Sequence, residues 1–542
     1  MKTLLLLSCL LVIATVTSGQ PLDTSEIRLS TTAEALTVQA KRIAHGELAT
    51  RQLTQLDIYL NATAKADPLL AVNSLPAATN PDETANVSLR GSPAVATGVY
   101  LNGVPLRSAV RLDQSNGVGQ FSIFGQLPVR DLTIYPSSPP LEYSQASAGV
   151  VALETAVGRP ARTTHGLSLN LVGVGYQQAR RVGKTGSLRG YVNATDLTAF
   201  RVLNGDRLKE LESSRGVDGM LSYAGKAGRN TELQAFYLGF TEGYRYQVAV
   251  PGGDQLFEQR KPRHLAIMNL KTEGERWDRR INQLLDWERP RFTFSDTSTT
   301  IERLTTHSAL HAERRGAGFS LRLGAAVNSY SDRIEGAGFR VNDLNYTVET
   351  YAQVQRRIGS DWLLGAGVKP VYDGRPAVNL HAAVRYRPTE PAWWHLSVGR
   401  HTQLLPPGAA TRDWQRLDLR QAALEYQHKL EDWTLRGAVY AKREMYELNE
   451  DLTVVGGEAE VDYRRGNWVA GLSAVSVRSR GELPTARDIP LAVRGQVRWG
   501  ANGWSAGLSH RGRSGTVGRF GELPAFERYP IYNRLDLALS KV

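Results

Sequence analysis

The chain has 542 residues and a formal net charge of +12. Its single cysteine, Cys9, lies close to the N-terminus, so the rest of the chain holds no disulfide framework, zinc–thiolate site or thiol nucleophile. The basic residues are spread along the whole chain rather than clustered, and we therefore do not expect a nucleic-acid partner.

Residues 1–19 have the pattern of a signal peptide. Lys2 is followed by an apolar run from Leu4 to Val16 and then by small residues that end at Gly19. This run is shorter than the roughly 20 residues that a transmembrane helix needs. A lipoprotein signal is the alternative, because the residues that end at Cys9 loosely match a lipobox. An exported chain without a longer apolar run can be periplasmic, secreted or an outer-membrane β-barrel.

Residues 60–157 differ from the rest of the chain and predict a domain of short strands and turns. They are rich in Ala, Pro, Ser and Gly, and they follow a leader that spans residues 20–59. Five segments of this part carry the motifs on which a family resemblance depends. In chain order they are residues 66–76, 87–91, 98–105, 128–135 and 141–153. Asn102-Gly103 in the third segment is a turn pair that tolerates positive φ.

These segments, in this order, resemble the plug domain of the TonB-dependent receptors. The resemblance implies an α+β plug at residues 60–157 inside a transmembrane β-barrel at residues 158–542. It assigns structural roles in the plug to Leu89, Arg90, Gly91, Asn102, Gly103 and Gly149. Arg90 is expected to pair with a carboxylate on the barrel wall, with a ligand contact as the alternative. The segment 135–140 departs from the family pattern, as does Asn102, where the family has an acidic residue.

The resemblance also points to a segment of the leader. Glu34, Leu36, Thr37, Val38 and Ala40 resemble a TonB box, an extended segment that adds as a strand to a TonB-like energy-transducing protein in the periplasm. An unstructured leader or a helix is the alternative for residues 21–60.

From about residue 164 the sequence alternates between apolar and polar residues, which predicts strands. Residues 491–499 place Leu491, Val493, Val497 and Trp499 on one face, with arginines on the other, and residues 433–442 repeat the pattern. We count roughly 19 such segments of about ten residues, the length of a tilted membrane-crossing strand. A large antiparallel barrel of about 19–22 strands follows, with a soluble all-β protein as the alternative. The family has 22 strands, so the sequence predicts truncation at the C-terminus, a miscount or a small barrel.

The connections between these segments alternate in length. Tight turns are expected at 431–432, 465–467 and 500–503, and long loops at 242–262, 331–344, 401–415 and 512–530. Several tryptophans near the expected strand ends suit an aromatic girdle at the lipid interface. Short turns at one rim and long loops at the other are typical of a bacterial outer-membrane barrel.

The sequence holds no catalytic constellation, cofactor motif or metal site. His307 and His311 have helical metal spacing but lie in an alternating segment, where about 13 Å separates them. The resemblance implies a Gram-negative outer-membrane TonB-dependent receptor, not an enzyme, that contacts outer-membrane lipid and imports a siderophore, cobalamin or similar chelate. A passive porin, a structural or adhesive barrel and an outer-membrane hydrolase are the alternatives. The many arginines favour an anionic small-molecule ligand, which the sequence does not identify.

Overall fold

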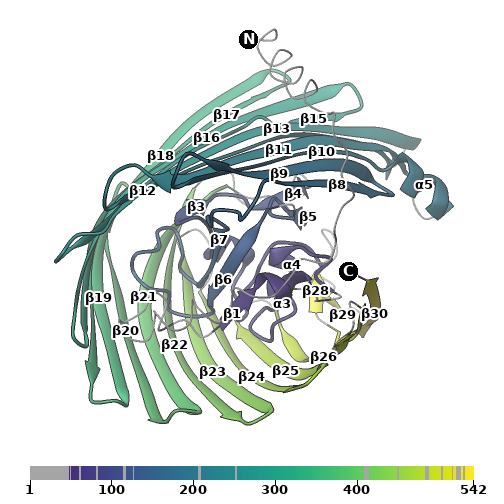
Figure 1. Ribbon diagram of the computed structural model, residues 1–542. Coiled ribbons are helices and arrows are strands. Elements are labelled where there is room, and N and C mark those ends of the chain that lie inside the picture. Colours follow the sequence, from purple (N-terminus) through teal and green to yellow (C-terminus); the bar gives the residue numbers. More distant parts are fainter. Residues whose placement is uncertain are drawn as a thin grey trace.

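The computed structural model describes Leu48 and residues 51–541. Gaps in this description fall at residues 60, 62, 81–82, 114–116, 126, 206–208, 251–252, 408–413, 448–450, 482–486, 502–503, 516, 520–525 and 529–530. Figure 1 shows a wide ring of strands that surrounds a smaller group of strands and helices from the N-terminal part of the chain.

The ring is a closed antiparallel barrel of 21 strands, from β8 to β27 together with β30. Because β14 and β15 both pair with β13 and β16, they are two parts of one crossing. The first half of the barrel contains β8 (Thr164–Asn170), β9 (Gly173–Val182), β10 (Gly186–Asp196), β11 (Leu211–Lys226), β12 (Thr231–Val250), β13 (Gly253–Thr272), β14 (Asp278–Glu288), β15 (Arg291–Phe294), β16 (Thr297–Gly316) and β17 (Phe319–Gly336). The second half contains β18 (Phe339–Ile358), β19 (Trp362–Tyr372), β20 (Pro376–Thr389), β21 (Ala392–Leu405), β22 (Gln415–Leu430), β23 (Trp433–Tyr446), β24 (Leu452–Arg465), β25 (Trp468–Arg480), β26 (Ile489–Ala501), β27 (Trp504–Arg513) and β30 (Tyr532–Lys541). The number of strands agrees with the sequence prediction.

The prediction of long loops was wrong for two segments. Residues 242–262 and 331–344 lie mostly in the paired strands β12, β13, β17 and β18, which reach 18 to 20 residues each. A strand of this length exceeds the thickness of a bilayer, so part of it extends beyond the lipid-facing belt. The connection from β27 to β30 remains long and carries the short hairpin of β28 (Val517–Arg519) and β29 (Phe526–Arg528).

Inside the ring lies the plug, built on a five-stranded sheet with the order β1-β6-β7-β2-β3 (Figure 1). Its elements are β1 (Arg51–Thr54), α3 (Gln55–Tyr59), α4 (Pro68–Val72), the 3-10 helix η3 (Ala94–Ala96), β2 (Thr97–Leu101), β3 (Val104–Leu106), β4 (Val110–Asp113), β5 (Gly119–Ser122), β6 (Val129–Tyr135) and β7 (Gly149–Thr155). Strand β1 pairs with β6, so the plug begins upstream of residue 60 and the expected boundary at 59–60 is too late. One further helix, α5 (Thr198–Asn204), lies in the connection between β10 and β11.

The short helix α4 illustrates how local sequence forms the plug. Asp67 is its N-cap and accepts hydrogen bonds from the backbone N–H groups of Leu69 and Leu70, while Pro68 occupies the first helical position. The second carboxylate oxygen of Asp67 accepts from the N–H of Ser122 at 2.6 Å. One buried carboxylate therefore caps α4 and ties it to β5.

The apolar core of the plug continues into one side of the barrel wall. Buried plug residues such as Leu89, Leu101 and Phe124 belong to the same cluster as Phe236 and Leu265, which face inward from β12 and β13. The outward face of the barrel is apolar as well, and Val439 and Leu472 are 59% and 58% exposed there. In the described part of the chain, no helix combines the length and apolar character needed to span a bilayer.

Candidate functional site: the junctions between plug and barrel

Arg90 joins the plug to the barrel at a fully buried ionic junction. Its guanidinium lies 2.9 Å from Glu458 and 2.7 Å from Glu425, which face inward from β24 and β22. It also donates to Ser137 of the plug at 3.0 Å and lies over the ring of Tyr440. Burial alone would lower the pKa of Arg90, but the two carboxylates outweigh it and hold the pKa above its usual range. Arg90 is therefore a permanent cation that two barrel carboxylates share.

The residues on either side of Arg90 make this geometry possible. Leu89 is fully buried in the plug core. Arg90 itself has a φ of 52°, and Gly91 has a φ of 76°, so two consecutive residues adopt the left-handed conformation. A Cβ on Gly91 would lie 2.6 Å from a methyl group of Val454 on β24, so only glycine permits this close approach. The plug backbone thus touches the barrel wall at the point where Arg90 enters its pocket.

The expected turn at Asn102-Gly103 makes a second contact with the wall. Asn102 has a φ of 50°, and its side-chain oxygen accepts from the backbone N–H of Thr155 at 2.8 Å. Asn269 and Asn282 of the barrel donate to the carbonyl oxygens of Asn102 and Gly103, at 2.7 and 3.0 Å. The asparagine that departs from the family pattern therefore still closes the turn, and it does so without adding a charge.

Gly149 acts inside the plug rather than at the wall. It begins β7 and pairs with Thr97 of β2. A Cβ at this position would lie 2.6 Å from the carbonyl oxygen of Tyr135 and 2.7 Å from Leu89, so glycine permits β7 to pack closely against β6. All six plug residues that the sequence singled out are described, and all of them except Gly149 contact the barrel wall.

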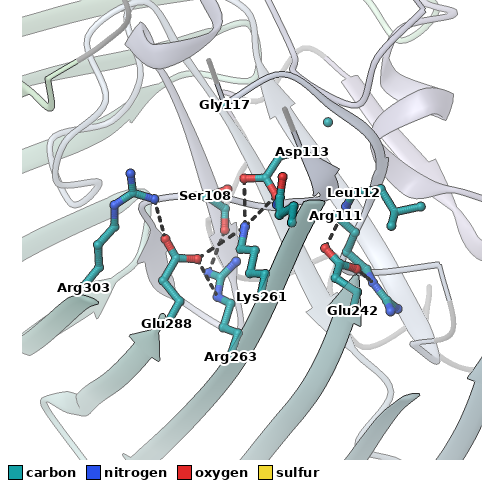
Figure 2. A network of polar contacts seen from close by, with 12 residues as sticks. Ser108, Arg111, Leu112, Asp113, Gly117, Glu242, Lys261, Arg263, Glu288 and Arg303 are labelled. Atoms are coloured by element: carbon teal, nitrogen blue, oxygen red, sulfur yellow. Dashed lines mark hydrogen bonds and ion pairs between the residues drawn. The ribbon is translucent and has the colours of Figure 1, made fainter. Parts of the chain in front are cut away.

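A larger ionic cluster holds the β4–β5 hairpin against β13 and its neighbours (Figure 2). Lys261 of β13 lies 2.8 Å from Asp113 of the plug and 3.4 Å from Glu288, and it is completely buried. Arg263 pairs with Asp286 at 2.7 Å and donates to the backbone carbonyl of Ser108 in the plug, also at 2.7 Å. The cluster is completed by Arg303, 2.8 Å from Glu288. Three cations thus face three carboxylates without net charge.

A second ionic contact lies beside this cluster, on the same hairpin (Figure 2). Arg111 lies 3.1 Å from both Asp218 of β11 and Glu242 of β12, and it stacks over Phe240. Glu242 also accepts from the backbone N–H of Leu112 at 2.8 Å. Burial lowers the pKa of Arg111, and the two carboxylates raise it further than burial lowers it. The hairpin is consequently held on both of its sides by ion pairs whose carboxylates are buried.

Other buried contacts continue around the plug. Glu142 lies 3.4 Å from Arg322 of β17 and 3.5 Å from Arg280 of β14. Lys442 of β23 donates to the backbone carbonyl of Leu89 at 3.0 Å, and Arg494 of β26 donates to that of Leu75 at 2.9 Å. Polar contacts between plug and wall therefore extend from β11 to β26.

The two histidines with metal-like spacing have separate partners. His307 forms a hydrogen bond with Asn328, and His311 forms one with Tyr351. Among the described residues, no group of three or more His, Cys, Asp or Glu side chains has the geometry to hold a metal ion. Glu34, Leu36, Thr37, Val38 and Ala40, the TonB-box candidates, lie outside the described residues.

The sequence did not identify the barrel partners of the plug. Asp113 lies 148 positions from Lys261 along the chain, and Lys261 lies in a segment expected to be a loop. The alternating pattern could show only that such residues point inward. Their pairing depends on strand register and on the placement of the plug.

Comparison with known proteins addresses the fold. No protein-family model matches this sequence, and no curated protein matches it. Among solved structures, the siderophore receptor PirA from Acinetobacter baumannii matches with a TM-score of 0.69 at 9% identity, covering 92% of both chains. The FrpB iron transporter from Neisseria meningitidis has a TM-score of 0.69 at 11% identity, covering 90% of this chain and 92% of its own. The copper transporter OprC has a TM-score of 0.65 at 14% identity, covering 83% of both chains.

The chain has the plug-and-barrel fold of these receptors and transporters. This confirms the fold that the sequence motifs predicted, with the plug in front of the barrel in the chain and inside it in space. In the plug-and-barrel fold of this chain, the contacts between its two parts are the features that can couple them, and they form the candidate functional site.

Proposed function

We propose that this chain is an outer-membrane receptor that imports a scarce nutrient by a TonB-dependent mechanism. The observation that carries this proposal is a plug held inside the barrel by buried ion pairs, with Arg90 shared by Glu425 and Glu458. A passive pore needs an open lumen, and a structural or adhesive barrel has no need for a separately folded domain there. A plug held by ionic contacts on all sides is consistent with a transport path that opens only when those contacts are broken.

The outer surface supports a membrane location. Apolar side chains cover the middle of the barrel, and aromatic pairs gather near the rim that carries the tight turns. Trp362 stacks on Tyr386, with ring centroids 4.3 Å apart, and the pairs Trp394–Tyr426 and Trp433–Tyr463 lie beside it around the barrel. Amphipathic rings at such a rim match the interface between hydrocarbon and water.

The nature of the ligand is a further part of the proposal. The three comparison proteins are named as a siderophore receptor, an iron transporter and a copper transporter. We infer that the cargo here is also a scarce chelate, such as a siderophore or cobalamin. The many arginines of the chain favour an anionic chelate, since they raise the local concentration of anions.

The plug topology suggests how a pulling force would act. The TonB-box candidate at residues 34–40 precedes β1, which is the edge strand of the plug sheet and pairs only with β6 in the described part of the chain. Four residue pairs join β1 to β6, and Arg51 of β1 forms an ion pair with Glu460 of β24. Force applied upstream of β1 would therefore act first on a short edge strand and only later on the plug core.

The experiment compares ligand binding with ligand uptake in whole cells. Deletion of residues 30–42 should abolish uptake and leave binding at the cell surface unchanged. Proline at Val38 should have the same effect, because proline removes a backbone donor from an added strand. The matched control is Ser25→Pro, in the same leader but outside the candidate segment. Uptake that survives both the deletion and Val38→Pro would refute the coupling step.

A further inference from the structure

Four arginines lie side by side across neighbouring strands of the barrel. Arg400 of β21 is in register with Arg420 of β22, which is in register with Arg443 of β23. Arg443 is in register with Thr453 of β24, and Thr453 with Arg480 of β25. We call Arg400, Arg420, Arg443 and Arg480 the arginine row.

The arginine row points away from the plug. The residue that follows each of the first two arginines faces inward and contacts the plug, since His401 reaches Ser138 and Gln421 donates to the carbonyl of Ser147. Lys442, directly before Arg443, donates to plug carbonyls as well. Because side chains alternate along a strand, the arginines must lie on the outer face.

The row lies where the apolar outer surface ends. Next to it on the same outer face are the exposed apolar residues Leu396, Val398, Leu424, Val439 and Val455. The row is nearer to the rim with the long connections between β21 and β22, β23 and β24, and β25 and β26. The opposite rim carries the tight turns and the aromatic pairs. The row thus occupies the edge of the apolar belt on the side that faces away from the periplasm in a bacterial barrel.

The arginine row carries more positive charge than the nearby carboxylates neutralise. Asp418 pairs with Arg400 at 2.5 Å, and Asp451 pairs with Arg443 at 2.9 Å. Arg420 and Arg480 have no ion-pair partner among the residues that the structure describes, and both are exposed. Arg478 adds another exposed cation on the same outer face of β25. A cationic strip at a lipid boundary is costly unless an anion lies against it.

We propose that the arginine row binds the phosphate groups of lipid headgroups in the outer leaflet. Guanidinium groups bind phosphate through paired hydrogen bonds. Neighbouring strands place Arg400, Arg420 and Arg443 about 5 Å apart in succession, with Arg480 beyond the intervening strand β24, so that one headgroup can contact two arginines. The row lies on the outside of the barrel, where a lipid reaches it and a soluble ligand in the lumen does not. This inference depends on insertion of the barrel in the membrane, but it does not depend on transport.

The test measures lipid binding to the purified full-length protein in detergent by native mass spectrometry. The probes are bisphosphorylated lipid A and the same lipid after removal of its phosphates. The variant Arg420→Gln/Arg480→Gln removes the two cations that lack a partner. Arg314→Gln/Arg356→Gln is the matched control, because these arginines are also exposed on the outer face but lie beside tight turns at the opposite rim. Heat-modifiable migration confirms that each variant retains its barrel.

The expected result is tight binding of the phosphorylated lipid to the natural protein and to the control variant. Each basic residue near a lipid surface contributes about fivefold in affinity, so loss of two should weaken binding about 30-fold. The lipid without phosphates should bind weakly to all three proteins. Equal binding of the row variant and the natural protein would overturn the proposal, and so would equal binding of the lipids with and without phosphate. The lipid-binding assay does not depend on uptake. A failure of the proposed transport function would therefore leave its outcome unchanged.

Discussion

Substitution of Arg90 is the sharpest test of how the plug is held. Arg90→Gln removes the cation and leaves the carboxylates of Glu425 and Glu458 buried beside each other. Breaking a buried ion pair by removing one partner costs about 3–5 kcal/mol. We therefore expect the equilibrium constant for local detachment of the plug from the barrel wall to rise about 100- to 4,000-fold, since each 1.4 kcal/mol is a factor of about ten.

Hydrogen exchange of the plug amides in detergent-solubilised protein measures this opening. Protection should fall in the segment around Leu89 to Gly91 and in β6, which adjoins Ser137, while the barrel strands retain theirs. Arg90→Lys keeps the charge but lacks the planar guanidinium that bonds both carboxylates. Its loss of protection should therefore be smaller than that of Arg90→Gln. Neutralising all three residues, as Arg90→Gln/Glu425→Gln/Glu458→Gln, should restore part of the protection because no unpaired charge is then buried.

The matched control is Arg130→Gln. Arg130 is also a plug arginine, but it is 51% exposed and pairs with its neighbour Asp131 at the surface. Surface substitutions of this kind usually change stability by less than about 0.5 kcal/mol. If Arg90→Gln leaves plug exchange as slow as Arg130→Gln does, the Arg90 junction does not hold the plug and the argument fails.

Three further predictions concern the plug and its contacts. Lys261→Met should speed amide exchange in the β4–β5 hairpin by a similar factor, because it removes the cation that pairs with the buried Asp113, whereas Glu288 keeps Arg303; unchanged exchange there would contradict it. Asp67→Asn retains the cap of α4 but orphans the N–H of Ser122, which should lower plug stability in urea by about 1–3 kcal/mol. Burial raises the pKa of Asp67, so as the pH falls the folded state binds a proton at this carboxylate at a higher pH than the unfolded state does. Its contribution to stability should therefore be greatest below about pH 4 and decrease as the pH rises through the folded-state pKa, a dependence that urea titrations of Asp67→Asn should lack.

Much of the barrel could be predicted from the sequence because its strands separate two solvents. Residues 491–499 alternate between apolar and charged side chains, and β26 covers them all. The same holds for residues 433–442 in β23. Lipid outside and a polar lumen inside impose a period of two that short sequence windows reveal. The plug could be predicted from its motifs, because Arg90 and the Asn102-Gly103 turn require particular residues at positive φ.

The failures have a physical cause as well. Residues 242–262, expected to form a loop, contain glycine, proline and several charges. In the structure they continue β12 and β13, which stay paired as far as Val250 and Gly253. The ionic cluster around Lys261 was missed for the same reason. A local pattern shows that a charge points inward, but not whether it faces water or a buried carboxylate of the plug.

A disulfide between plug and wall would test the central claim most directly. A Cβ built on Gly91 lies 3.9 Å from the Cβ of Val454, within the range of a disulfide, and the only natural cysteine is Cys9 in the expected signal peptide. Val454→Cys removes the methyl group that a side chain at position 91 would meet at 2.6 Å, and Val477→Ala removes the one at 2.9 Å. Gly91→Cys/Val454→Cys/Val477→Ala should therefore reach the outer-membrane fraction and run as a compact, looped species on a non-reducing denaturing gel, with normal migration after reduction. A protein that fractionates away from the outer membrane, or one that stays uncrosslinked under oxidation, would contradict a plug seated inside a membrane barrel.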